Sequence, residues 1–160
     1  MFNFLKCPKF VVISPAKGKL KCITEVADKV FSSKALGDGF AVEPENGEVY
    51  SPVDGVIGAL FPTLHAVGIK AGNGTEILIH IGVDTVELNG EGFQAFVMQG
   101  QKVKAGELLI KFDLEAVKSR VPSTDIIVVF SSGESCELLK DAQKVNDREA
   151  DIVSIKAKEK

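Results

Sequence analysis

The sequence predicts an all-β fold, a compact antiparallel β-sandwich or barrel-like structure with only short helical segments. Most apolar residues fall in short runs rich in valine and isoleucine, a composition typical of strands. Glycine and proline separate these runs at the regular intervals seen in sandwiches. Only residues 114–119 have a clear helical signature, because Asp113 is a suitable N-cap and Pro122 stops the helix.

The predicted strands follow one another along most of the chain. Residues 1–9 are interrupted by Pro8 and are expected to form a loose end, and residues 157–160 a solvated tail. Residues 134–149 are expected to be a charged connection. Strands are predicted at residues 10–13, 19–23, 40–42, 47–51, 56–61, 66–69, 77–81, 93–97, 107–112, 126–130 and 152–155.

Residues 24–31 are predicted to form a short helical turn or loop, in which Val26, Val30 and Phe31 share one side at helical spacing. Two further segments resemble each other. Residues 14–20 read S-P-A-K-G-K-L and residues 51–57 read S-P-V-D-G-V-I. Either a true internal repeat or a shared turn chemistry explains this likeness, and both explanations stay open.

The two histidines of the chain lie in or beside two consecutive predicted strands. His80 lies within a buried strand, and His65 directly precedes the partner run at residues 66–69. If these runs pair as an antiparallel hairpin with Gly72 and Asn73 at its centre, the two histidines stand opposite each other. We therefore expect both imidazoles to meet on one face.

A pair of neutral imidazoles suits a nucleophile, a metal ligand or a general base. Each ring offers one lone pair, while its other nitrogen donates a hydrogen bond that fixes the tautomer. The alternative is that each histidine is only a satisfied part of the core. Placement of both beside Thr63 and Asp84, in a chain without other histidines, favours a functional pair.

Composition and charge exclude several functional classes. A length of 160 residues fits one domain, and a net charge of −3 gives no basic footprint for nucleic acid. No apolar run approaches the roughly 20 residues that cross a bilayer, and no secretory signal is present, so we expect a cytoplasmic protein. Cys7, Cys22 and Cys136 are scattered and odd in number, which predicts reduced structural thiols.

The histidine block resembles a known family. Residues 74–86 read G-T-E-I-L-I-H-I-G-V-D-T-V and continue as E-L-N-G-E-G-F. They are similar to the glucose-type IIA component of the bacterial phosphoenolpyruvate-dependent sugar phosphotransferase system. Supporting segments are F-P-T-L-H-A-V at residue 61, L-G-D-G-F-A-V at residue 36, S-P-V-D-G at residue 51 and G-Q-K-V-K-A-G at residue 100.

The resemblance implies a sandwich of the duplicated hybrid motif type that acts as a phosphocarrier. Such a protein receives a phosphoryl group from the phosphocarrier protein HPr and passes it to a cysteine of a IIB domain, for uptake and phosphorylation of glucose or a related sugar. By motif position, His80 is phosphorylated on Nε2, His65 stabilises the phosphoryl group and Thr63 orients His65. No cofactor is required, since positioning and hydrogen bonds carry most of phosphoryl transfer.

The resemblance also implies a partner-binding rim around the histidines. HPr and the IIB domain would dock on apolar side chains, with two carboxylates facing the basic surface of HPr. We expect a monomer without stable membrane insertion, and regulatory protein targets are compatible with the family. The implied residues are Asp28, Val30, Phe31, Leu36, Phe61, Leu78, Asp84 and Val86.

Other classes share parts of these motifs. A zinc metallopeptidase needs about three protein ligands, with two histidines one residue apart, but Gly82 occupies the second position. Adventitious zinc at His65 and His80, completed by a partner's carboxylate, is compatible with the sequence. A biotinyl or lipoyl carrier presents its lysine in a tight turn, whereas Lys111 lies inside a predicted strand. The glycine-rich turn at residues 37–39 lacks the helix and lysine of a nucleotide-binding loop.

Overall fold

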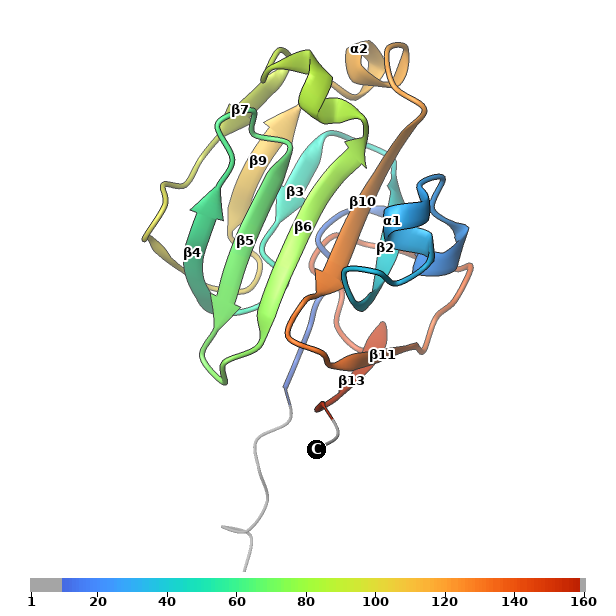
Figure 1. Ribbon diagram of the computed structural model, residues 1–160, viewed down its shortest axis with the longest axis vertical. Coiled ribbons are helices and arrows are strands. Elements are labelled where there is room, and N and C mark those ends of the chain that lie inside the picture. The colour runs from blue at the N-terminus through green and yellow to red at the C-terminus, as the bar shows by residue number, and fades with distance from the viewer. Residues whose placement is uncertain (1–9, 159–160) are drawn as a thin grey trace, which may run out of the picture.

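The structure, a computed structural model, describes residues 10–158 and consists mainly of β-strands (Figure 1). The loose end predicted at residues 1–9 and the last residues of the predicted tail lie outside this range. In chain order the strands are β1 (Gly18–Cys22), β2 (Asp38–Pro44), β3 (Glu48–Tyr50), β4 (Gly55–Leu60), β5 (Ala66–Ala71), β6 (Glu76–Val83), β7 (Phe93–Ala95), β8 (Lys102–Val103), β9 (Leu108–Phe112), β10 (Ser123–Phe130), β11 (Ser135–Leu138), β12 (Lys144–Val145) and β13 (Val153–Lys156).

Helical segments are few and short. The predicted helix begins after Asp113, whose side chain accepts a hydrogen bond from the Ala116 N–H at 3.1 Å. The segment at residues 24–31 contains a 3-10 turn and a second α-helix. The helical elements are η2 (Ile23–Glu25), α1 (Lys29–Ser32), η3 (Thr85–Leu88) and α2 (Leu114–Lys118).

Eight strands form one sheet in the order β12-β1-β2-β10-β6-β5-β4-β8. Three more, in the order β3-β9-β7, form a second sheet that lies behind it (Figure 1). β11 pairs with β13 toward the bottom of the view. All of these pairings are antiparallel. The predicted antiparallel β-sandwich is therefore confirmed.

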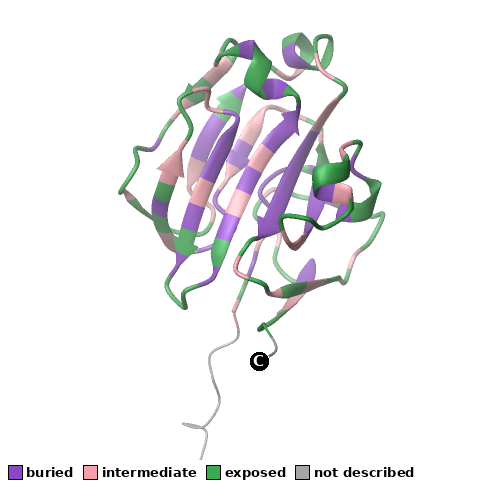
Figure 2. Ribbon diagram, in the orientation of Figure 1, coloured by how far each residue is buried: buried purple, intermediate pink, exposed green. Residues whose placement is uncertain are grey.

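The main apolar core lies between the two larger sheets and draws residues from both. Successive side chains of a strand point to opposite faces. Ile77, Ile79 and Ile81 of β6 are therefore buried in this core, whereas Leu78 and His80 point to the outer face and are half-buried (Figure 2). The alternation of β6 thus places one histidine at the surface of a rigid, well-packed strand.

A second apolar cluster lies on the outer face of the large sheet, beneath α1 and η2. Phe31 of α1 belongs to it together with Ile127 and Val129 of β10. The N-cap of α1 is Asp28, whose carboxylate accepts a hydrogen bond from the Val30 N–H at 2.9 Å. This cover extends over one half of the outer face and leaves β4, β5 and β6 open (Figure 1).

The two S-P-x-x-G segments occupy equivalent places, which favours a true repeat. The hydroxyl of Ser14 donates to the Ala16 carbonyl and that of Ser51 to the Val53 carbonyl, each at 2.7 Å. The first segment leads into β1, which pairs with β12 and β2, and the second into β4, which pairs with β8 and β5. The order of the large sheet is therefore symmetric about its central pair, β10 and β6.

The registers show which residues correspond. Val42 in β2 and Ile69 in β5 hold matching positions, since they face Leu20 of β1 and Ile57 of β4. Val42 pairs with Ile126 of β10, and Ile69 pairs with Ile77 of β6. Ile126 and Ile77 are therefore equivalent. Three residues further along each strand, Val129 of β10 is equivalent to His80 of β6.

Three predictions of local structure are wrong. Residues 10–13 form no strand, because the N–H groups of Ile13 and Ser14 donate to carbonyls of two segments far apart in the sequence. The connection expected at residues 134–149 contains β11 and β12, whose few apolar residues gave no strand signal. Val30 does not share a side with its buried neighbours, since its side chain is 49% exposed.

Within residues 10–158, no helix is long and apolar enough to cross a membrane. Cys22 and Cys136 are free, as expected of reduced thiols, and Cys7 lies outside the described residues. Burial raises the pKa of the Cys136 thiol to about 12. A thiol of this kind is a poor nucleophile, which fits a structural role.

The repeat generates a test of backbone conformation. Gly100 and Ala142 follow equivalent loops, with φ of 90° and 62°, and their N–H groups donate to the carbonyls of Ile57 and Leu20. Gly100→Ala is expected to lower the free energy of unfolding by about 1 kcal/mol, because alanine is strained in the left-handed conformation. Nothing lies within 4 Å of the added Cβ, so no steric clash adds to this cost. Ala142→Gly is expected to raise it by about 0.5–1 kcal/mol.

Urea denaturation of both variants measures these changes. Each variant is the matched control of the other, because the same methyl group is added in one loop and removed in the equivalent one. Changes of the same sign in both would contradict the equivalence of the two loops.

Candidate functional site

The β5-β6 hairpin brings the two histidines together, in a register that differs from the predicted one. Ala66, not His65, stands opposite His80. The connecting loop spans residues 72–74 instead of a central pair, and Gly74 has a φ of 93°. A left-handed glycine that closes a loop of odd length shifts the pairing by one residue. The predicted register is therefore wrong.

The rings still meet, because His65 lies outside the regular part of the hairpin. β5 begins at Ala66, and Leu64 on the other side of His65 has a φ of 59°. The alternation of strand faces therefore does not fix the direction of His65. The centroids of the two imidazoles are 5.0 Å apart with an interplanar angle of 82°. The expected meeting of the rings on one face is confirmed.

His80 presents a free lone pair on Nε2. Its Nδ1 lies 2.8 Å from the carbonyl oxygen of Gly82, and because a carbonyl only accepts, Nδ1 carries the proton. Burial lowers the pKa of His80, an effect that the Gly82 hydrogen bond and the carboxylates of Asp28 and Asp84 partly oppose. The neutral ring is thus held with Nε2 available as a nucleophile or ligand.

Gly82 directs its carbonyl toward His80 from a left-handed conformation with a φ of 74°. A Cβ here would lie 2.6 Å from Cγ2 of Thr85 and 2.9 Å from the carbonyl oxygen of Ser123, so no side chain fits. The hydroxyl of Thr85 donates to the Ile81 carbonyl at 2.5 Å. The carbonyl that orients His80 therefore belongs to a tightly fixed turn.

His65 is buried, with 6% of the residue exposed. Its Nδ1 lies 2.5 Å from the hydroxyl oxygen of Thr63, which is able to donate to a bare nitrogen or accept from a protonated one. Burial, with a smaller contribution from His80, lowers the pKa of His65 to about 4. His65 is therefore neutral at pH 7, and Thr63 is placed to orient its ring.

Apolar side chains surround the two imidazoles. The Phe31 ring lies 4.9 Å from that of His80, and the Phe61 ring 5.6 Å from that of His65, measured between centroids. Phe31 is buried and Leu78 is half-buried, so these two members of the predicted rim pack beneath the site and expose little surface to a partner. The members of the predicted rim that are between 40% and 49% exposed are Val30, Leu36, Phe61 and Val86.

The two predicted carboxylates lie close enough to act on His80. Both Asp28 and Asp84 favour the charged form of its ring. Asp28 is half-buried at the start of α1, and Asp84 is exposed at the start of η3. Neither takes part in an ion pair within residues 10–158.

Comparison with known proteins identifies the family. The family model of the phosphoenolpyruvate-dependent sugar phosphotransferase system, EIIA 1, matches residues 10–136. The chain belongs to this family. A glucose-specific EIIA component of Bacillus cereus is 50% identical to this EIIA chain over 129 residues, which cover 81% of it and 78% of the relative.

Two further comparisons agree with this assignment. A glucosamine-specific EIICBA component of Bacillus subtilis is 51% identical over 120 residues, 75% of this EIIA chain and 19% of that protein. The solved structure of glucose permease IIA from Mycoplasma capricolum superposes with a TM-score of 0.87 at 39% identity, over 96% of this chain and 99% of that one. Sequence and fold therefore point to the same family.

The EIIA site has few groups for a metal ion. Within residues 10–158, no cluster of three or more His, Cys, Asp or Glu side chains is arranged to hold one. A catalytic zinc needs about three protein ligands, of which His65 and His80 would supply two. Zinc at His65 and His80 would need further ligands from a partner. Lys111 lies in β9 with its Nζ 3.8 Å from Glu48, not in the tight turn of a swinging-arm carrier.

Sequence reasoning missed two residues that shape the EIIA site, Thr85 and Ser123, and it missed the ion pair between Lys21 and Asp125. Cγ2 of Thr85 and the carbonyl oxygen of Ser123 leave no room for a Cβ at Gly82. Asp125 is only 4% exposed and pairs with Lys21 at 3.0 Å. A single carboxylate at the start of the apolar β10 run was the one available signal for this pair.

The depressed pKa of His65 predicts a pH dependence of stability. An unfolded histidine has a pKa near 6.5, and that of folded His65 is about 4, so between these values the unfolded chain binds more protons. The contribution of His65 to stability is therefore fully present above about pH 6.5 and is lost as the pH falls toward 4. NMR titration of the His65 ring measures the pKa directly.

His65→Gln is expected to flatten the fall of Tm with pH in this window, because glutamine does not titrate. Asn73, exposed in the β5-β6 loop, offers a control, and Asn73→Gln should leave the slope unchanged. An ordinary pKa near 6.5 for His65 would contradict the burial argument.

Proposed function

We propose that this EIIA chain is a cytoplasmic phosphocarrier that takes a phosphoryl group from phospho-HPr on His80 and passes it to a cysteine of a IIB domain. The observation that carries the proposal is a pair of imidazoles 5.0 Å apart, in which Nδ1 of His80 is bound to the Gly82 carbonyl. Nε2 is then the one nucleophilic nitrogen of the His80 ring. The IIB domain in turn phosphorylates glucose or a related sugar during uptake.

Each transfer exchanges one bond to phosphorus for another. The lone pair of His80 Nε2 attacks the phosphorus as the bond to the HPr histidine breaks, and the HPr nitrogen recovers its lone pair. The proton on Nδ1 of His80 stays in place, held by the Gly82 carbonyl. In the second transfer a cysteine thiolate of the IIB domain attacks the phosphorus, and the bonding pair returns to Nε2. No metal or proton acceptor is needed for either step.

His65 is suited to stabilise the phosphoryl oxygens. If the Thr63 hydroxyl donates to Nδ1 of His65, the proton of the neutral ring resides on Nε2, which then serves as a hydrogen-bond donor. Such a donor is most useful in the transition state, when charge spreads over the equatorial oxygens. Because the pKa of His65 is about 4, the ring stays neutral and does not trap the phosphoryl group as a cation would.

The exposed apolar rim and its carboxylates fit two successive protein partners. Val30, Leu36, Phe61 and Val86 are exposed apolar side chains that we propose form the docking rim, and a rim of this kind needs little shape change to accept different proteins. Asp28 and Asp84 complement a basic surface such as that proposed for HPr. We propose that the chain meets HPr and the IIB domain as a monomer, and that any regulatory protein uses this same face.

The sugar is proposed at the level of its class. Relatives of similar identity are described as glucose-specific and as glucosamine-specific. The chemistry of the His80 site involves only a phosphoryl group, so it does not discriminate between such sugars. We propose glucose or a related sugar, with selection made by the membrane component. We also propose that the transfer requires no cofactor, with zinc bound only at an interface with a partner.

Substitution of the histidines separates acceptance from donation. His80→Gln is expected to take up no phosphoryl group, because it lacks the nucleophilic nitrogen. His65→Gln is expected to accept from phospho-HPr yet donate to the IIB domain about a hundredfold more slowly, the usual effect of removing one transition-state donor. Rapid-quench assays with labelled phosphoenolpyruvate, enzyme I, HPr and a IIB domain measure both transfers.

The glutamine variants are designed to keep the fold, because the amide group is able to donate to the Gly82 carbonyl or to accept from Thr63. Circular dichroism and Tm report whether they do. A label that is stable in base and released by acid identifies phosphohistidine. Detection of that label on folded His80→Gln would show that the proposed acceptor is wrong.

The carboxylates of Asp28 and Asp84 are expected to speed the association of the chain with phospho-HPr. Asp28→Asn and Asp84→Asn should each raise the KM for phospho-HPr several-fold at low ionic strength and leave kcat unchanged, because long-range attraction mainly affects encounter. The difference should vanish in high salt. Asparagine also caps helices, so Asp28→Asn preserves α1. Asp141→Asn, an exposed aspartate near β12, is the control, and an equal effect there would contradict a local role.

A further inference from the structure

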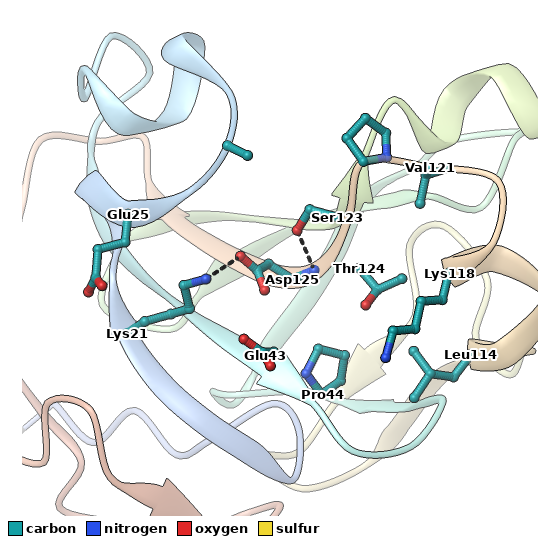
Figure 3. A pocket seen from close by; sticks show the side chains of 12 residues that line it. Lys21, Glu25, Glu43, Pro44, Leu114, Lys118, Val121, Ser123, Thr124 and Asp125 are labelled. Carbon is teal, nitrogen blue, oxygen red and sulfur yellow. Dashed lines mark hydrogen bonds and ion pairs between the residues drawn. The ribbon is translucent and has the colours of Figure 1, made fainter.

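Lys21 of β1 and Asp125 of β10 form an ion pair, with Nζ of Lys21 3.0 Å from Oδ2 of Asp125. Their side chains are 19% and 6% exposed, so this is the most buried ion pair within residues 10–158. The pair lines a cavity of about 310 Å³ bordered by β1, β2, β10 and the region of α2 (Figure 3). Neither residue belongs to the site described above, yet the pair spans β2 and links two strands.

Asp125 lies in an irregularity of the central strand pair. Along β10 and β6, Ser123 faces Val83 and Ile126 faces Ile81, with a shift of register between them. Thr124 and Asp125 therefore stand opposite the single residue Gly82. Two residues facing one make a β-bulge, a feature that bends a strand and redirects the groups beside it.

The bulge is anchored at Asp125 by two interactions. Its backbone N–H donates to the Ser123 hydroxyl at 3.1 Å, inside the bulge itself, and its carboxylate reaches Lys21 across β2 (Figure 3). The first interaction shapes the bulge locally. The second fixes the bulge relative to the rest of the sheet, because Lys21 projects from the regular ladder that β1 forms with β2.

The backbone of the bulge lies directly against Gly82. The Ser123 carbonyl oxygen would lie 2.9 Å, and Cα of Thr124 3.7 Å, from a Cβ at Gly82. Cγ2 of Thr85 would lie closer still to that Cβ, at 2.6 Å. These neighbours restrict the backbone conformation of Gly82, and so they fix the direction of its carbonyl. That carbonyl accepts the hydrogen bond from Nδ1 of His80 at 2.8 Å.

We propose that Lys21 and Asp125 are positioning residues for His80: the ion pair anchors the β10 bulge, the bulge fixes the Gly82 carbonyl, and the carbonyl holds His80 in the tautomer that leaves Nε2 free. The inference rests on the proposed function, since it explains how that nucleophile is prepared. A buried ion pair commonly adds little net stability over well-packed apolar residues. A role in positioning the bulge would explain why two charged side chains are buried at this point of the sheet.

The test removes both charges, so that no unpaired ion remains buried. In the double variant Lys21→Met with Asp125→Leu, the ratio of Nδ1–H to Nε2–H tautomers of His80 is expected to fall about tenfold, which corresponds to the loss of one hydrogen bond. Long-range proton-nitrogen correlation NMR of the His80 ring measures the ratio. The kcat for phosphorylation by phospho-HPr should fall in proportion to the fraction of His80 that remains in the Nδ1–H form, while KM stays unchanged because the rim is intact.

Two variants serve as controls. Lys21→Arg keeps a cation within reach of Asp125 and is expected to retain the wild-type tautomer and kcat. Lys140→Met breaks the ion pair between Lys140 and Glu149, away from β10, and should change neither quantity. Thermal melts report folding. If the double variant unfolds, Lys21→Gln with Asp125→Asn replaces it, because this pair also removes both charges and keeps side chains of similar size, and the same direction of change is expected.

A folded double variant with the wild-type tautomer ratio and kcat would overturn the positioning role. Equal effects in Lys140→Met would also overturn it, since they would reflect general destabilisation. The tautomer ratio is measured without phosphoryl transfer. If wild-type His80 accepts no phosphoryl group, the proposed function fails while the NMR comparison still decides whether the ion pair positions the ring.

Discussion

The hydrogen bond from Nδ1 of His80 to the Gly82 carbonyl joins the chemistry of the site to the geometry of the sheet. The acceptor lies only two residues further along the same chain, so the strand must bend for its own carbonyl to reach the ring. Gly82 supplies the left-handed conformation, and the bulge in β10 lies directly against it. The state of the imidazole thus depends on the regularity of β6 up to His80 and on its interruption directly afterwards.

β6 explains why the site has a rigid backbone and yet lies at the surface. Ile77, Ile79 and Ile81 anchor β6 in the main core, so the residues between them project from a fixed backbone. On the outer face, α1 covers β10 and brings Phe31 to the edge of the His80 ring. Partners would therefore meet a rigid reactive group at the border between covered and uncovered sheet.

Much of this arrangement was predictable from local sequence signals. The short apolar run around His80 identified β6, the Asp113 cap identified α2, and the histidine block identified the family. The register was missed by one residue because two-residue and three-residue loops are both compatible with a Gly-Asn-Gly sequence, and only the backbone at Gly74 distinguishes them.

Other features depend on contacts between segments far apart in the chain. The second half of the repeat was not recognised, because residues 101–107 read Q-K-V-K-A-G-E and residues 143–149 read Q-K-V-N-D-R-E, in which Arg148 holds the left-handed place of Gly106. The partnership of Lys21 with Asp125 likewise arises only when β1, β2 and β10 lie side by side.

The symmetry of the large sheet has one more consequence. Val129 holds in β10 the place of His80 in β6, but it is fully buried and shares its apolar cluster with Phe31. The internal repeat has therefore not produced a second reactive site, because a buried apolar residue occupies the position equivalent to His80. If His80 carries the proposed phosphoryl group, the molecule holds one such group at a time, so the donor and acceptor proteins must bind in turn.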